Sequence, residues 1–90
     1  MLPPGKIVDE RCYTIENLQL KYTLYEDKLD GRTTFSVGVT LYDSSDGHSE
    51  REAVFDITSL RENADDIFRA ISGGAVTPMT LGEVIYDLLP

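Results

Sequence analysis

Residues 53–71, AVFDITSLRENADDIFRAI, change the spacing of their apolar side chains halfway along. Before Ser59, Ala53, Phe55 and Ile57 alternate with Glu52, Val54 and Asp56, which predicts a strand with the first three residues facing the core. After Ser59 the apolar residues recur every three or four positions, which predicts a helix with one apolar stripe. This stretch therefore predicts a strand that leads directly into a helix.

The helix predicted after Ser59 has signals for its start and its end. Ser59 and Glu62 have the spacing of a capping box, in which each side chain satisfies a free amide of the first turn. The pair Gly73-Gly74 is expected to end the helix, because glycine readily adopts the left-handed conformation found there. The expected buried stripe consists of Leu60, Ala64, Ile67, Phe68 and Ile71.

Two runs upstream of this stretch alternate in the same way and predict two more strands. Asp30-Gly31 separates them, and residues 43–47 separate the second run from the third; both segments have the composition of turns. Short turns between alternating runs favour an antiparallel meander. The residues expected to face the core are Leu18, Leu20, Tyr22, Leu24, Phe35, Val37, Val39 and Leu41.

A second, shorter helix is predicted at the end of the sequence. Thr80 and Glu83 repeat the capping-box spacing, and Met79 with Val84 has the spacing of a hydrophobic staple. Pro78 disfavours helix in the residue before it and so marks the entry. The expected buried stripe consists of Leu81, Val84, Ile85 and Leu88.

These elements predict an α+β fold: a three-stranded antiparallel meander followed by two helices packed on one face, as a two-layer sandwich. Residues 1–11 contain Pro3-Pro4-Gly5, which disfavours both helix and sheet, and we expect them to be a flexible N-terminal tail. Residues 12–90 are expected to form a single domain, a normal size for one hydrophobic core.

The charge and the cysteine content of the chain indicate which partners it is expected to bind and where in the cell it is expected to be. Sixteen acidic residues against eight scattered basic ones give a net charge of −8, which disfavours binding to nucleic acids and to anionic membranes. An acidic decoy for a nucleic-acid-binding protein would require the carboxylates to gather on one face. The lone Cys12, the lack of a recognisable signal segment and the lack of an apolar run of about 20 residues favour the cytoplasm.

The residue types that usually carry catalysis or metal binding are sparse and separated. His48 is the only histidine and lies in a polar turn, and Cys12 has no histidine near it in sequence. The acidic turn at 43–50 departs from a calcium-binding loop, because the twelfth position, counted from Asp43, is Val54. We therefore expect no catalytic residue, no metal site and no cofactor, and we favour a protein that is not an enzyme.

The face of the sheet that points away from the helices is the predicted interaction surface. Tyrosine is enriched at protein interfaces, and Gly38 in the middle of this face would let a partner approach closely. The free edge of the strand at 18–24 is a second candidate, because an open edge can accept a strand from another chain. The residues assigned to the face are Lys21, Thr23, Tyr25, Thr40, Tyr42 and Val54.

Two functions of different classes are compatible with these observations. The first is a non-enzymatic protein-interaction or regulatory module that binds another protein or a second copy of itself. The alternative is a small-molecule-binding domain or minor enzyme with a pocket between helices and sheet, lined by Tyr22, Tyr86 and Cys12. The sequence does not identify the partner, the pathway or the oligomeric state.

The segment Val76–Asp87 reads Val-Thr-Pro-Met-Thr-Leu-Gly-Glu-Val-Ile-Tyr-Asp. With the preceding helix and meander, it resembles a family of small uncharacterised proteins of Firmicute-type bacteria, a domain of unknown function that ends in Val-Thr-Pro-x-x-Leu-x-x-Val-x-x-Asp. The resemblance implies a bacterial, cytoplasmic protein and implies no site residues.

Overall fold

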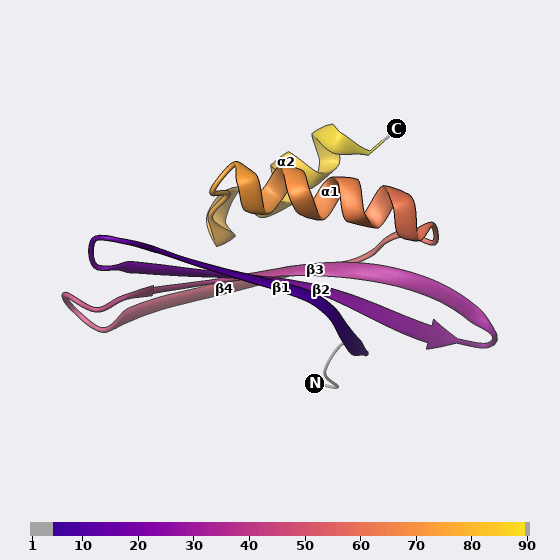
Figure 1. The fold of residues 1–90 in the computed structure, drawn as a ribbon, viewed down its shortest axis with the longest axis horizontal. Helices are drawn as coiled ribbons and strands as arrows, with labels where there is room; N and C mark the ends of the chain where they lie inside the picture. Colours follow the sequence, from indigo (N-terminus) through magenta and orange to yellow (C-terminus); the bar gives the residue numbers. More distant parts are fainter. Residues whose placement is uncertain (1–4, 90) are drawn as a thin grey trace.

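The computed structural model describes residues 5–89, which form one antiparallel sheet followed by two helices. The strands lie in the order β1-β2-β3-β4, so each pairs with its neighbour in sequence. Both helices lie on the same side of the sheet (Figure 1). None of the helices in this part of the chain has the length and apolar character needed to cross a membrane. The elements are β1 Lys6–Ile15, β2 Leu18–Leu29, β3 Arg32–Asp43, β4 His48–Thr58, α1 Arg61–Gly73, the 3-10 helix η1 Pro78–Thr80 and α2 Leu81–Leu88.

The prediction of a three-stranded sheet is wrong, because the sheet has four strands. The additional strand, β1, begins at Lys6 and so includes residues 6–11 of the expected tail, whereas residues 1–4 lie outside the described part of the chain. Its pairing with β2 shifts between Ile7 and Asp9, so Val8 is an extra residue and the alternation of faces is interrupted there. Most of its side chains are exposed, which leaves little apolar pattern in the sequence.

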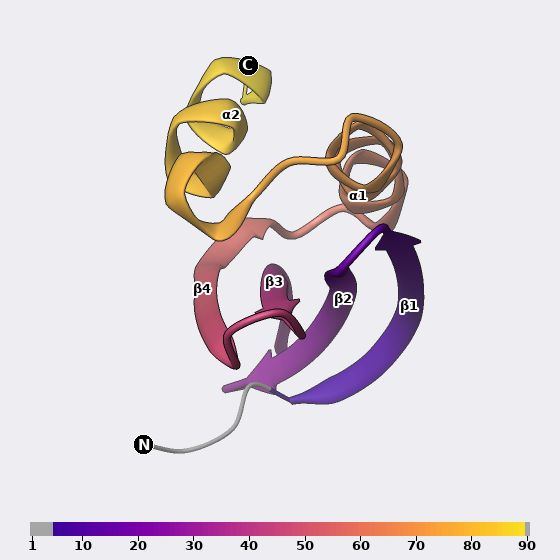
Figure 2. The same ribbon diagram turned by 90° about the vertical axis from the view of Figure 1, so that its left-hand side faces the viewer.

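The core lies between the sheet and the two helices, as the change of period at Ser59 predicts. β2 and β3 supply its centre, and α1 and α2 close it from above. α1 lies above the β1–β2 side and α2 above β4 (Figure 2). The buried hydrophobic residues are Leu20, Tyr22, Leu24, Phe35, Val37, Val39, Ile57, Ala64, Ile67, Phe68, Ile71, Leu81 and Ile85.

An irregularity in β4 reverses the side-chain directions that simple alternation predicts. Phe35 pairs with Thr58 and Val37 pairs with Val54, so residues 55–57 of β4 stand opposite a single residue of β3. Asp56 has a φ of 56° at this point, which is uncommon for a residue other than glycine. As a result Val54 packs against the core, and Phe55, which was expected to be buried, is 46% exposed.

The helix starts also differ from the predicted capping boxes. α1 begins at Arg61 without a side-chain cap; the hydroxyl of Thr58, not that of Ser59, accepts a hydrogen bond, from the Leu60 amide at 3.2 Å. α2 likewise has no side-chain cap, because the hydroxyl of Thr80 bonds to Thr77. Met79 is 83% exposed and so does not form the predicted staple. Both helices are therefore held in place mainly by their buried stripes.

Candidate protein-binding surface

The outer face of the sheet is less open than the sequence suggests. Thr23 and Ser36 are buried on this face, with Thr23 only 5% exposed. The Tyr25 ring lies over Gly38: a methyl group added at Gly38 would come within 3.2 Å of Cε2 of Tyr25. Tyr25 therefore occupies the space that we expected a partner to use, as aromatic residues often do beside a glycine in a sheet.

The six residues assigned to the outer face are not brought together. Lys21, Thr40 and Tyr42 lie close to each other, since Lys21 pairs with Thr40 across β2 and β3 and Tyr42 follows two residues later. The Lys21 side chain is 3.5 Å from the carboxylate of Glu10. Thr23 and Tyr25 are largely covered, and Val54 lies on the helix side of the sheet. The predicted docking edge at 18–24 is also closed, because β2 lies between β1 and β3.

The pocket that the alternative function requires is not formed by its three expected residues. Tyr22 is buried, and its hydroxyl donates a hydrogen bond to the carbonyl of Val76 at 2.9 Å. Burial raises the pKa of the Tyr22 hydroxyl, with a smaller contribution from the nearby Tyr13. Tyr86 is 80% exposed, and Cys12 is exposed on the edge strand β1.

A hollow of about 460 Å³ lies elsewhere, where β2 turns into β3 and β4 leads to α1. Its lining side chains carry polar groups that bond to each other: the hydroxyl of Thr34 donates to the carboxylate of Asp56 at 2.9 Å. Within residues 5–89, no three His, Cys, Asp or Glu side chains are arranged to hold a metal ion. The residues around the hollow are Asp30, Arg32, Thr34, Asp56, Thr58 and Ser59.

The turn between β3 and β4 holds the only histidine in a local network. The carboxylate of Asp43 accepts bonds from the hydroxyl and the amide of Ser45, which lowers the pKa of Asp43. His48 Nε2 lies 2.7 Å from the carboxylate of Glu50, and this hydrogen bond raises the pKa of His48 above its usual 6.5. These hydrogen bonds all lie within the turn, so its local structure accounts for Asp43, Ser45, His48 and Glu50.

The raised pKa of His48 predicts a pH-dependent contribution to stability. Because the folded pKa is raised, the stabilisation is fully present below the unfolded pKa of 6.5 and is lost as pH increases through the folded value. We expect the melting temperature of the protein to exceed that of His48→Gln at about pH 5.5, and the difference to vanish as the pH rises past the raised pKa of His48. A difference that is constant or increases with pH would contradict this.

The most exposed large apolar side chains of the described chain belong to η1 and α2. Met79 is 83% exposed and Tyr86 is 80% exposed. Met79 lies in η1, directly before α2, and Tyr86 lies in α2; their spacing of seven residues is about two helical turns, which gives the two side chains similar directions. The opposite side of α2 carries Leu81 and Ile85, which are buried against the core. The helix is thus fixed on one side and presents apolar groups to solvent on the other.

Gly82 lies between these two residues in sequence and leaves a gap among the side chains that cover α2. It lies three residues after Met79 and four before Tyr86, which places it beside Tyr86 on the surface of α2. No atom lies within 4 Å of a methyl group added at Gly82. The gap therefore has room for a side chain from another molecule.

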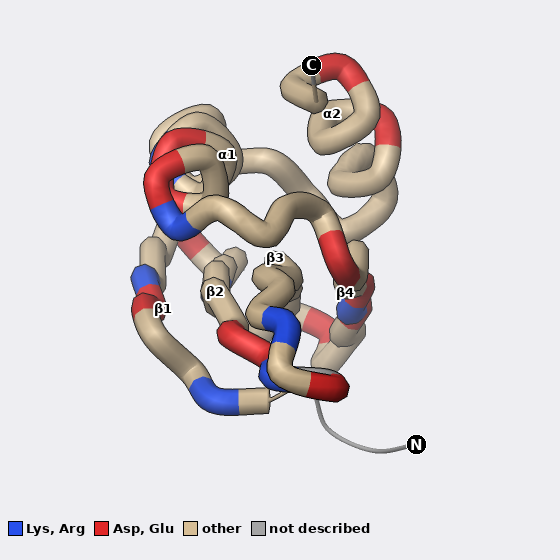
Figure 3. The backbone as a smooth tube through the Cα atoms, turned by 90° about the vertical axis from the view of Figure 1, so that its right-hand side faces the viewer, with Lys and Arg blue, Asp and Glu red and all other residues tan. Residues whose placement is uncertain are grey.

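The rest of the exposed side of α2 is acidic. Glu83 and Asp87 are exposed, and residues 70–89 contain no Lys, Arg or His. Figure 3 shows only acidic residues among the charged positions of α2, whereas α1 carries both signs. We call the five residues Met79, Gly82, Glu83, Tyr86 and Asp87 the α2 surface.

Sequence reasoning did not identify the α2 surface, although the signal was present. It assigned Met79 to a staple and Tyr86 to a pocket, and both side chains instead point away from the core. Plotting the segment at 100° per residue places Met79 and Tyr86 within about 20° of each other and away from the buried pair Leu81 and Ile85, with Gly82 between Tyr86 and Ile85.

Comparison with known proteins gives a family and no function. The family described as "Family of unknown function (DUF6514)" matches residues 7–90. No curated protein and no solved structure matches the chain.

Proposed function

Since this chain belongs to the family of unknown function DUF6514, we propose its role from its own surface: it is a non-enzymatic protein-interaction module that binds another protein through the α2 surface. The observation that carries the proposal is the exposure of Met79 in η1 and Tyr86 in α2, next to the residues Leu81 and Ile85 that anchor α2 to the core. Single exposed apolar residues are ordinary, but two large ones beside an open gap form a patch.

The residue types of the α2 surface support this proposal. Tyrosine and methionine are enriched at the centres of protein interfaces, and tyrosine is frequent among the residues that dominate binding energy. Tyr86 offers a large, rigid ring with a polar tip, and Met79 offers a flexible side chain that adapts to its contact. Lys21, Thr40 and Tyr42 form a smaller candidate patch on the outer face of the sheet.

The proposal includes the origin and location implied by the sequence. The segment Val76–Asp87 supports a Firmicute-type bacterial origin. The single cysteine supports a cytoplasmic location, where an unpaired thiol stays reduced.

Selection from a displayed library of random 16-residue peptides tests the proposed surface. We expect the full chain to enrich peptides whose affinity falls at least tenfold for the double variant Met79→Ser/Tyr86→Ser. The matched control is Ile15→Ser/Leu60→Ser, which removes two exposed apolar side chains outside η1 and α2 and should leave the affinity unchanged. If no peptide is enriched, or if the enriched peptides bind Met79→Ser/Tyr86→Ser equally well, the proposal is wrong.

A further inference from the structure

We infer that the segment bound by the α2 surface is a basic amphipathic helix of another protein; this inference rests on the proposed function. Such a helix carries apolar residues on one side and lysine or arginine along the borders of that side. Three properties of the α2 surface support this choice of partner: its unpaired acids, its sign of charge and its gap at Gly82.

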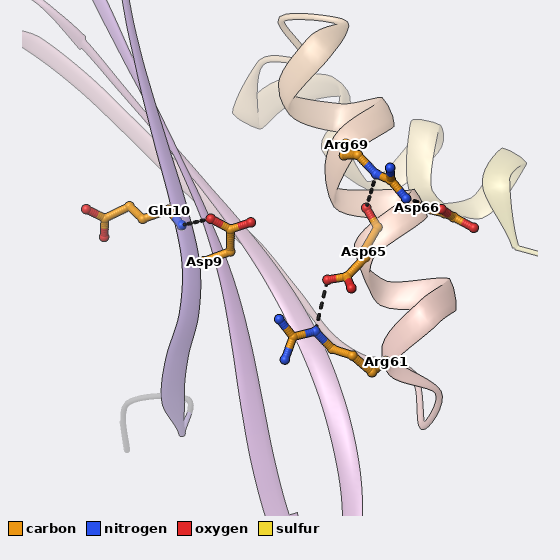
Figure 4. Close-up of polar contacts among 6 residues, drawn as sticks. All are labelled: Asp9, Glu10, Arg61, Asp65, Asp66 and Arg69. Carbon is orange, nitrogen blue, oxygen red and sulfur yellow. Dashed lines mark hydrogen bonds and ion pairs between the residues drawn. The ribbon is translucent and has the colours of Figure 1, made fainter.

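The acids of α2 lack the internal partners that Asp65 and Asp66 of α1 have. In α1, Arg61 pairs with Asp65 at 2.9 Å and Arg69 pairs with Asp66 at 2.6 Å (Figure 4). Neither Glu83 nor Asp87 takes part in an ion pair among the residues that the structure describes. Their carboxylates are therefore available to basic groups of another chain, in contrast to those of Asp65 and Asp66.

The negative charge of the α2 surface favours a basic segment of another protein over a second copy of this chain. If two copies met through their α2 surfaces, Glu83 and Asp87 of one copy would face the same residues of the other, and this like-charge contact is unfavourable. The net charge of −8 also repels every approaching copy of the chain. A segment with lysine or arginine beside its apolar residues instead gains attraction and a faster encounter.

The gap at Gly82 favours a helix over an extended strand. A strand gains its affinity from backbone hydrogen bonds at a sheet edge, whereas the backbone of α2 is already bonded within the helix. Two helices pack by placing the side chains of one between those of the other, and a glycine allows a close approach. An apolar side chain of the partner can occupy the space between Met79 and Tyr86.

The size of the surface sets an expectation for affinity. The eight residues of α2 extend about 12 Å, which is about two helical turns, so few side chains of the partner can be in contact. Interfaces of this size are characteristic of transient complexes. Opposite charges at the border should make the affinity decrease as salt increases.

The peptides from the selection above test the class of partner. We expect the enriched peptides to carry a positive net charge, with apolar residues spaced three and four positions apart. The charge-reversed variant Glu83→Lys/Asp87→Lys should bind them at least tenfold more weakly, and copies of the peptides with Glu in place of Lys should prefer this variant. The control Glu16→Lys/Glu62→Lys changes the net charge equally at two exposed carboxylates outside η1 and α2, and should change the affinity less than threefold.

Two variants at one position test the gap itself. Gly82→Leu should weaken binding of the basic peptides at least tenfold, because its side chain fills the space between Met79 and Tyr86. Gly82→Ala should raise the melting temperature, because alanine favours helix more than glycine does and meets no atom within 4 Å. If Gly82→Leu binds the basic peptides as well as the unmodified chain does, the inferred packing is wrong.

The outcomes separate this inference from the proposed function. Peptides that depend on Met79 and Tyr86 but are neutral or acidic would overturn the basic helix and leave the interaction surface in place. Peptides that do not depend on these two residues would overturn both. A dimer in light scattering that Met79→Ser/Tyr86→Ser dissociates would show that a second copy is the occupant, and would also overturn the inference.

Discussion

Replacing Phe68 with alanine is expected to lower the free energy of unfolding by about 3–5 kcal/mol, the usual range for a large aromatic side chain in a core. Phe68 is 1% exposed and lies on the side of α1 that faces the sheet. The loss comes from the burial of the ring and from the cavity that its removal leaves. Since small domains have a total stability of about 5–15 kcal/mol, the variant should be close to unfolding. Urea denaturation followed by circular dichroism measures the change.

Leu60→Ala is the matched control for this prediction. Leu60 immediately precedes α1 but is 60% exposed, so its truncation should change the free energy of unfolding by no more than about 0.5 kcal/mol. A cost below about 1 kcal/mol for Phe68→Ala would mean that α1 does not pack on the sheet through this residue, and the two-layer arrangement would be wrong.

Leu81→Ala is expected to cost about 2–5 kcal/mol and to loosen α2 before the rest of the chain. Leu81 is fully buried at the start of a helix of only eight residues. A helix this short is not stable in water alone, so α2 depends on Leu81, Ile85 and Pro78 for its structure. Hydrogen exchange should show loss of protection first in the amides of α2, while β2 and β3 stay protected.

Tyr86→Ala provides the comparison on the opposite side of the same helix. Tyr86 is exposed, so the variant should change the free energy of unfolding by no more than about 0.5 kcal/mol while it weakens partner binding. If Leu81→Ala left the protection of α2 unchanged, or Tyr86→Ala destabilised the fold as much as Leu81→Ala, the assignment of the two sides of α2 would be wrong.

Much of the architecture could be predicted from the period of the apolar residues. The change at Ser59 correctly predicts that a strand leads directly into a helix, and the centre of the core contains Phe35, Val37 and Phe68 as expected. These residues lie in regular segments, where a single period determines which side chains are buried.

The errors lie where the backbone departs from that period. β1 escaped prediction because the extra residue Val8 interrupts its alternation and because few of its side chains are buried. The orientation of Val54 and Phe55 was wrong because residues 55–57 bulge, and the left-handed residue of the bulge is Asp56 rather than a glycine that would mark it. The capping boxes failed because a spacing of three residues is necessary for such a cap but not sufficient.

The candidate surfaces also differ in how far the local sequence determines them. The covering of Gly38 by Tyr25 depends on the pairing of β2 with β3, which local sequence does not determine. The exposure of Tyr86 depends only on helical period, and could have been predicted once Leu81 and Ile85 were assigned to the core.

The contact between Tyr25 and Gly38 constrains how this family can change over time. Because the ring fills the space above the glycine, a larger residue at position 38 is compatible with the fold only if position 25 becomes smaller or its side chain turns away. The two positions should therefore vary together among relatives, a bulky residue at one accompanying a small residue at the other. A substitution at only one of the two positions would expose or crowd Thr23 and Ser36, the buried residues with hydroxyl groups on the outer face.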